Sequence, residues 1–174
     1  KIAKKMFQVA KKCGVDAVKL QTRNNKELFT NKMYNSEYNS YNSYGRTYGL
    51  HREKLEFDKK NYIELKKYAE GLDLIFFSTP FDFKSVDFLE KIDLPLYKIG
   101  SGDLKNIPLI KYINSTKKPI ILSTGGGTEK DVSRAYKVLS NNKNLAILQC
   151  TSMYPCNAED LNLSSSNSLL KSIE

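Results

Sequence analysis

Hydroxyl side chains recur at the ends of short apolar segments of this chain. Five segments share this ending, with Thr22, Ser78 and Thr79, Ser101, Ser123 and Thr124, and Thr151 and Ser152. A single Ser or Thr after a strand is most often a turn or helix-capping residue. Five such endings, with glycines at Gly100, Gly102 and 125–127, favour a site whose hydroxyl and backbone N–H donors bind phosphate or carboxylate oxygens.

Two of the apolar segments also contain a lysine, Lys19 and Lys98. A strand lysine can lie at a sheet edge with its ammonium group in water, and each residue alone fits that interpretation equally well. In a closed barrel no strand has a free edge, so an inward lysine has to meet an anion or a carboxylate. Together with the hydroxyls, the two lysines predict a pocket for a small, strongly anionic substrate.

The other candidates for chemistry are weaker. His51 is the only histidine, so no metal site can be built from histidines of this chain. Asp82 and Asp103 follow strands directly, where each could cap the next helix or bind a substrate hydroxyl, and both alternatives stay open. Cys150 has no histidine beside it to act as a base, so it is interpreted as a small buried residue.

Alternating strands and helices have to position these residues. Residues 1–12 have the apolar spacing of a helix, and residues 16–22 form a predicted strand. Residues 23–57 lack clear periodicity and are either a functional loop or an excursion with short helices of its own. Beyond them the alternation is regular. Predicted helices at 62–71, 83–91, 106–115 and 128–142 each precede a strand, within 72–80, 94–101, 118–125 and 144–155.

Five strand candidates separated by helices, without a hairpin signal, predict an α/β fold with a parallel sheet. An open doubly wound sheet and a (β/α)8 TIM barrel both fit this order. The barrel is favoured, because no G-x-G-x-x-G follows the first strand and the only glycine run follows the fourth. About five βα units make the barrel incomplete, lacking its first strand and its last strands. We expect residues 1–174 to be one partial TIM-barrel catalytic domain.

The composition is that of a soluble globular protein. The chain has 174 residues, of which 40% are hydrophobic and 27% charged, and a net charge of +9. The basic residues are scattered, which favours a solvated surface over nucleic-acid binding. Three cysteines without a C-x-x-C pair favour a reduced, cytoplasmic chain. No apolar run approaches the length of a membrane span, so no membrane partner is expected. The chain does not begin with Met, which suggests that its ends are truncated.

Six segments distinguish this sequence from a generic barrel. They are AVKLQT at 17–22, YGLHREKLEF at 48–57, FFSTPFD at 76–82, YKIGSGDLKNIPLI at 97–110, KPIILSTGG at 118–126 and LQCTSMYP at 148–155. In order and spacing they resemble the N-acetylneuraminate (sialic acid) synthase family. The resemblance implies a TIM barrel that condenses phosphoenolpyruvate with an N-acylated aldose, typically N-acetylmannosamine, and releases a nine-carbon 2-keto sugar acid and phosphate.

The resemblance also implies residue roles. Lys19 and Lys98 match the lysines that hold phosphoenolpyruvate and are the predicted catalytic residues, and Thr79, Ser101 and Ser123 match its hydroxyl ligands. The full set of predicted substrate-binding residues is Gln21, Thr79, Phe81, Asp82, Ser101, Asp103, Ser123, Ser152 and Tyr154.

Two departures from the family pattern leave the acceptor sugar open. Asp103 matches a sugar-contacting position that is often Glu, and Gln149 stands where many members have His. Related synthases use diacetamido sugars to make legionaminic or pseudaminic acid, so these are alternative activities.

The family further implies a divalent metal, Mn²⁺ or Mg²⁺, that polarises the acceptor aldehyde. Its metal histidines and its small C-terminal antifreeze-like domain would follow Glu174, so no metal ligand and no bound metal are expected in this chain. The whole protein is expected to be a homodimer acting on small molecules. The 174-residue chain alone is expected to be inactive.

Two alternatives from other classes remain. A Schiff-base aldolase on the same barrel would use Lys98 or Lys19 as its nucleophile and would need a lysine with a lowered pKa. A non-enzymatic RNA-binding module would use the tyrosines of residues 34–48 with Arg46 as stacking groups, although these residues could equally pack the loop.

Overall fold

The computed structural model describes residues 1–165, and the chain divides into two compact units, Lys1–Leu94 and Pro95–Glu174. The first unit contains the parallel strands β1 (Ala17–Thr22) and β2 (Ile75–Pro80). The second contains β3 (Tyr97–Ile99), β4 (Ile120–Ser123) and β5 (Leu145–Leu148), which are parallel and adjacent in chain order. The predicted number and direction of the strands are confirmed within each unit.

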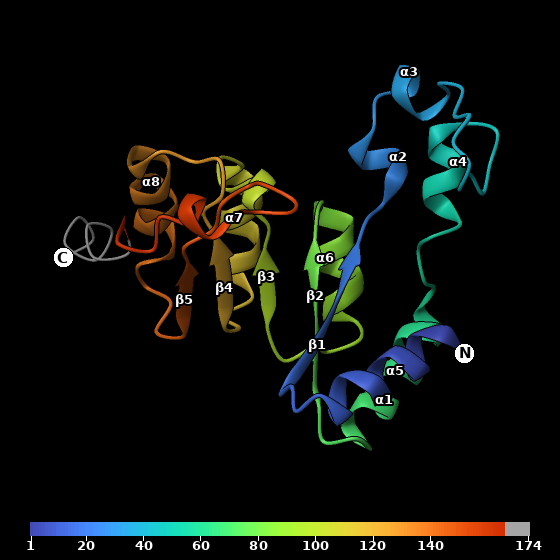
Figure 1. Ribbon diagram of the computed structural model, residues 1–174, viewed down its shortest axis with the longest axis horizontal. Coiled ribbons are helices and arrows are strands. Elements are labelled where there is room, and N and C mark those ends of the chain that lie inside the picture. The colour runs from blue at the N-terminus through green and yellow to red at the C-terminus, as the bar shows by residue number, and fades with distance from the viewer. Residues whose placement is uncertain (166–174) are drawn as a thin grey trace. The chain divides into compact units, whose positions relative to one another are not determined.

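Three helices pack against the strands of the first unit. They are α1 (Ile2–Lys12), α5 (Lys59–Glu70) and α6 (Phe83–Glu90), and Figure 1 shows α1 and α5 side by side. The aromatic rings of Phe7 and Tyr62, from α1 and α5, lie 5.6 and 5.9 Å from the ring of Phe76 in β2. This aromatic cluster fixes one face of β2 against the helices.

The irregular stretch after β1 is an excursion with short helices, the second of the two predicted alternatives. These helices are α2 (Asn25–Leu28), α3 (Asn31–Tyr34) and α4 (Tyr48–Glu53). Thr30 and Thr47 cap α3 and α4 by accepting hydrogen bonds from backbone N–H groups. Around His51 the tyrosines pack the loop: the Tyr44 ring stacks 5.7 Å from the imidazole, and the Tyr44 N–H donates to Nδ1 at 3.2 Å.

The second unit alternates strands with the helices α7 (Ile107–Ser115) and α8 (Glu129–Leu139), which pack against each other. Short 3-10 turns, η1 (Ser101–Asp103) and η2 (Ala158–Asp160), follow β3 and β5. Asn106 caps α7, and Thr128 with Asp131 forms a capping box at the start of α8. These caps explain why both helices begin within one residue of their predicted starts.

Side chains of each strand alternate between two faces. Phe76, Tyr97, Ile99, Ile120 and Leu122 are buried on the helix-covered face of their own unit. Within the first unit, Lys19 and Gln21 therefore share the opposite face with their register partners Phe77 and Thr79. Within the second unit, Lys98, Ile121 and Ser123 share the opposite face. The predicted site residues of the strands lie on these helix-free faces. None of the helices in residues 1–165 is long and apolar enough to cross a membrane.

Candidate functional site

Lys98 and Ser123 form the centre of a polar cluster in the second unit. The Lys98 ammonium group donates a hydrogen bond to Ser123 Oγ, and Ser123 is buried. Partial burial lowers the pKa of Lys98, and the nearby Cys150 thiol opposes this shift. A partly buried ammonium group beside a hydroxyl can bind an incoming phosphate or carboxylate oxygen with little loss of hydration.

Gly125 joins the segments that follow β3, β4 and β5. Its N–H donates to Ser101 Oγ at 3.0 Å. A Cβ placed on Gly125 would lie 2.5 Å from Ser152 Oγ and 2.9 Å from Ser101 Oγ. Ser101 and Ser152 thus meet at Gly125, and a side chain at this position would force their hydroxyl groups to move.

The glycine run differs from the predicted set of free anion-binding donors. The Gly125 N–H is used by Ser101, and the Gly127 N–H donates to Thr124 O at 3.1 Å. The prediction was wrong for these two amides, because the run forms a tight turn whose donors are satisfied internally. Its role is to position Ser101.

Asp103 and Tyr154 are two further predicted site residues of the second unit. Asp103 Oδ1 accepts a hydrogen bond from Asn106 Nδ2 at 3.1 Å, beside the start of α7. The Tyr154 side chain is 97% exposed, so the structure does not bring it to Lys98. Thr151, another predicted strand-end hydroxyl, donates to Asp160 O at 3.0 Å.

The first unit holds Lys19, Gln21 and Thr79 on one face of β1 and β2. Lys19 and Gln21 are exposed, whereas Thr79 is 2% exposed. Thr79 Oγ1 has no hydrogen-bond partner within the part of the chain that the structure describes. Because buried hydroxyls are normally paired, Thr79 is a candidate for contact with a bound substrate.

Three other strand-end hydroxyls have structural partners instead. Thr22 Oγ1 lies 2.6 Å from Tyr62 Oη and 2.7 Å from Ser78 Oγ, and Ser78 Oγ donates to Leu20 O at 3.0 Å. Thr124 Oγ1 donates to Leu148 O at 2.9 Å. The prediction that the hydroxyls of all five strand ends bind an anion is therefore wrong for Thr22, Ser78 and Thr124. Side chains alternate along a strand, and these three hydroxyls face protein partners.

Asp82 caps α6, which was one of its two predicted roles. Its carboxylate accepts hydrogen bonds from the Ser85 N–H, Ser85 Oγ and the Asn24 N–H, each at 2.7 Å. Asp82 is also buried, so these three protein donors occupy the group predicted to bind substrate. The adjacent Phe81 ring lies 4.0 Å from the Arg23 guanidinium carbon.

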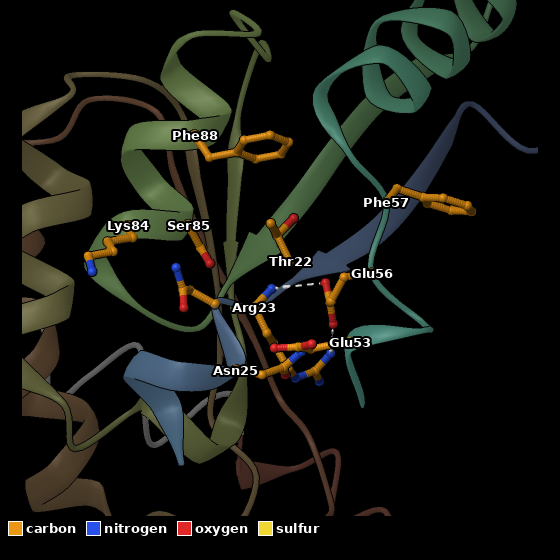
Figure 2. Close-up of a pocket in the computed structure, with 10 residues that line it drawn as sticks. Thr22, Arg23, Asn25, Glu53, Glu56, Phe57, Lys84, Ser85 and Phe88 are labelled. Atoms are coloured by element: carbon orange, nitrogen blue, oxygen red, sulfur yellow. Dashed lines mark hydrogen bonds and ion pairs between the residues drawn. The ribbon is translucent and has the colours of Figure 1, made fainter. Parts of the chain in front are cut away.

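Arg23 and Glu56 are site candidates that the sequence did not single out. The Arg23 N–H donates to Glu56 Oε2 at 3.1 Å, and Arg23 Nη1 lies 3.9 Å from Glu56 Oε1. Burial raises the pKa of Glu56, and the charge and N–H of Arg23 oppose that rise. The available signal was the position of Arg23, directly after the end of β1. Both residues line a cavity of about 270 Å³ in the first unit (Figure 2).

Residues 1–165 do not provide a binding site for the divalent metal that the family resemblance implies. No group of three His, Cys, Asp or Glu side chains among them is placed to hold a metal ion. Metal chemistry is therefore not assigned to any of these residues.

The chain is similar in sequence to known sugar-acid synthases. Human N-acetylneuraminate-9-phosphate synthase is 36% identical over 163 residues, which cover 93% of this chain and 45% of that protein. The N,N'-diacetyllegionaminic acid synthase of Campylobacter jejuni is 35% identical over 173 residues, which cover 97% of this chain and 52% of that protein. The chain thus spans about half the length of the relatives it matches.

A solved structure of the N-acetylneuraminic acid synthetase of Leptospira borgpetersenii, in complex with citrate, matches with a TM-score of 0.80 and 27% identity. The match covers 97% of this chain and 55% of that chain, and the predicted incomplete (β/α)8 barrel is confirmed. The NeuB family profile matches residues 6–174. Since this match includes all six segments that carried the resemblance, the chain belongs to the NeuB family.

Proposed function

We propose that the protein containing this chain condenses phosphoenolpyruvate with an N-acylated amino sugar, in surface carbohydrate biosynthesis. A bond forms between C3 of phosphoenolpyruvate and the aldehyde carbon of the open-chain sugar. Water adds at C2, the C2–O bond to phosphate breaks, and a nonulosonic acid and phosphate are released. Family membership supports this reaction, and the observation that carries it is the Lys98–Ser123 pair on the helix-free face of the second unit.

Lys98 binds an anionic oxygen of phosphoenolpyruvate, and Ser123 and Ser101 add hydroxyl contacts. The support is the partial burial of Lys98. Because its ammonium group has already lost part of its hydration, binding an anion there costs little further desolvation. Gly125 keeps Ser101 in place through the N–H bond to Ser101 Oγ. In the first unit, Lys19, Gln21 and Thr79 take part in substrate binding, and the unpaired Thr79 hydroxyl supports this role.

Asp103 is assigned to the acceptor sugar by its match to the family motif, and Ser152, Tyr154 and Phe81 are assigned to substrate binding. Asp82 is omitted because its carboxylate caps α6. Phosphoenolpyruvate supplies three carbons, so a 9-phosphate product corresponds to a hexosamine 6-phosphate acceptor. The names of the relatives therefore support two acceptor types, N-acetylmannosamine or its 6-phosphate and a diacetamido sugar.

The whole protein is proposed to be a cytoplasmic homodimer that uses Mn²⁺ or Mg²⁺. The metal ligands are assigned to parts of the protein other than the described residues, which hold no suitable cluster. A small C-terminal domain is assigned to the same remainder, since relatives are about twice as long as this chain.

The proposal is tested by measuring phosphate release from phosphoenolpyruvate by the intact protein. The acceptors are N-acetylmannosamine, its 6-phosphate and a diacetamido sugar, with an assay lacking acceptor as the control. We expect phosphate release to require one of the acceptors and to match formation of a nonulosonic acid. Failure of every acylated sugar to support release would exclude this function.

One observation favours a second candidate, a Schiff-base aldolase. The pKa of Lys98 is lowered, as a nucleophilic lysine requires. Borohydride reduction in the presence of pyruvate distinguishes the two, because the proposed condensation forms no imine. We expect no pyruvate adduct on Lys98; a stable adduct at that position would favour the aldolase.

A further inference from the structure

The cavity beside Arg23 and Glu56 adjoins the predicted substrate residue Gln21, because Arg23 Nη2 donates to Gln21 Oε1 at 2.7 Å. It is lined by Thr22, Arg23, Asn24, Asn25, Glu53, Glu56, Phe57, Lys84, Ser85 and Phe88. Lys19, Gln21 and Thr79 are not among these lining residues. With a volume of about 270 Å³, the cavity is slightly smaller than the usual pocket for a drug-sized ligand and is suited to a smaller molecule.

Asn25 supplies an acceptor that the protein does not use. The residue is 4% exposed, and its Oδ1 has no hydrogen-bond partner in residues 1–165. Figure 2 shows Asn25, Arg23 and Glu53 directed toward one another in the cavity. Because an unpaired buried acceptor is costly, this atom indicates a ligand that donates a hydrogen bond.

Around the cavity, the hydrogen-bond acceptors outnumber the donors that are available to a ligand. The Ser85 hydroxyl donates to Asp82, and the Thr22 hydroxyl is bonded to Tyr62 and Ser78. Glu53 accepts a bond from Tyr34 Oη at 2.5 Å through one oxygen. Glu56 is poorly solvated, which is why its pKa is raised.

Charge excludes strongly ionic ligands from this cavity. Its lining contains two carboxylates, Glu53 and Glu56, and two cations, Arg23 and Lys84, so the formal charges cancel. Lys84 is already paired with Glu27, and Arg23 with Glu56. Phe57 and Phe88 add apolar walls. A ligand that fits carries neutral hydrogen-bond donors and an apolar C–H face.

We infer that this cavity binds a neutral polyhydroxylated molecule of monosaccharide size. A hydroxyl or amide N–H of the ligand donates to Asn25 Oδ1, further hydroxyls donate to Glu56, and the C–H face of the ring contacts Phe88. The inference does not depend on the condensation reaction, since it uses none of the residues assigned to phosphoenolpyruvate.

The test measures binding of three matched sugars to the intact protein by isothermal titration. N-acetylglucosamine is neutral, glucosamine is cationic and glucuronate is anionic. We expect N-acetylglucosamine to bind at least about tenfold more tightly than either charged sugar. Equal binding of the three, or no binding of the neutral sugar, would overturn the inference.

Variants separate this cavity from the acceptor site of the proposed reaction. Asn25→Ala is expected to weaken N-acetylglucosamine binding at least about tenfold without lowering the melting temperature, because it removes an unpaired acceptor. Thr79→Val removes a hydroxyl that does not line the cavity and is expected to leave this binding unchanged. The opposite pattern, with Thr79→Val alone abolishing binding, would place the sugar among the predicted substrate residues and refute the inference.

A measurement on the unaltered protein covers the case in which Asn25→Ala does not fold. Addition of N-acetylglucosamine is expected to shift the amide resonances of Asn25 and Ser85 in NMR spectra. The amides of Lys19 and Thr79, which do not line the cavity, are expected to be unchanged. Shifts confined to Lys19 and Thr79 would contradict binding in this cavity.

Discussion

Lys98 combines a partly buried charge with a position at the end of a parallel strand. Its ammonium group contacts Ser123, and burial lowers its pKa from the ordinary lysine value of 10.5. An anion such as phosphoenolpyruvate stabilises the charged form and raises the pKa again. The charge state of Lys98 and substrate binding are therefore linked.

Binding of phosphoenolpyruvate is predicted to weaken at alkaline pH. As pH rises through the lowered pKa of free Lys98, the protein loses the positive charge that the substrate needs, so the dissociation constant increases. The loss should begin at a lower pH than for an ordinary lysine. Isothermal titration of the intact protein from about pH 7 to about pH 10 measures it. Lys98→Arg should flatten this dependence, because arginine keeps its charge.

At neutral pH, Lys98→Met is expected to weaken phosphoenolpyruvate binding by about 10- to 100-fold, the range for loss of one charge-assisted hydrogen bond. Lys111→Met removes an exposed lysine of α7 and is the matched control. Unchanged affinity in Lys98→Met would show that Lys98 does not bind the substrate.

A side chain at Gly125 is predicted to displace the hydroxyl groups of Ser101 and Ser152. Alanine would place Cβ 2.5 Å from Ser152 Oγ and 2.9 Å from Ser101 Oγ. Because serine hydroxyl groups can rotate, we expect Gly125→Ala to lower stability by only about 1 kcal/mol or less and to weaken phosphoenolpyruvate binding by moving Ser101 Oγ. Denaturant unfolding and isothermal titration measure the two effects.

Gly102 provides the control for this substitution, because a Cβ there has no neighbour within 4 Å. Gly102→Ala should therefore leave stability and binding nearly unchanged. Adding Ser152→Gly to Gly125→Ala should recover part of the loss. Equal effects of alanine at both glycines would argue against a steric role for Gly125.

At the scale of elements, Asp82 connects two segments of the first unit. It caps α6 through Ser85 and also accepts the Asn24 N–H from the segment before α2. Asp82→Ala leaves these backbone donors unpaired, and we expect a loss of about 1–3 kcal/mol in the free energy of unfolding. Asp16→Ala, at an exposed aspartate, is the control. If both variants unfold alike, the bridging role of Asp82 is excluded.

Element boundaries were largely predictable where local signals were strong. Thr128 and Asp131 form a capping box, and Asn106 precedes a proline in the first turn of α7, so both starts are encoded within a few residues. The segment 23–57 was ambiguous because α2 and α3 contain four residues each. Helices this short depend on packing instead of periodicity.

At the scale of the whole molecule, length limits what the chain can do alone. The chain spans about half of the relatives it matches, and Lys19 and Gln21 on β1 are exposed. We expect the 174-residue chain by itself to release no phosphate from phosphoenolpyruvate, whereas the intact protein is active. Assays of both under the same conditions test this, and comparable rates would refute it.

The sequence by itself determined the βα alternation, the parallel strands, the family and the candidate lysines and hydroxyls, because these depend on local periodicity and on short motifs. Tertiary structure decided which hydroxyls remain available. Thr22 and Ser78 bond to Tyr62 and to each other, whereas Thr79 has no partner in the described residues. It also brought Arg23 to Glu56, residues separated by three short helices. Such partners come from distant segments, and no local pattern in the chain specifies them.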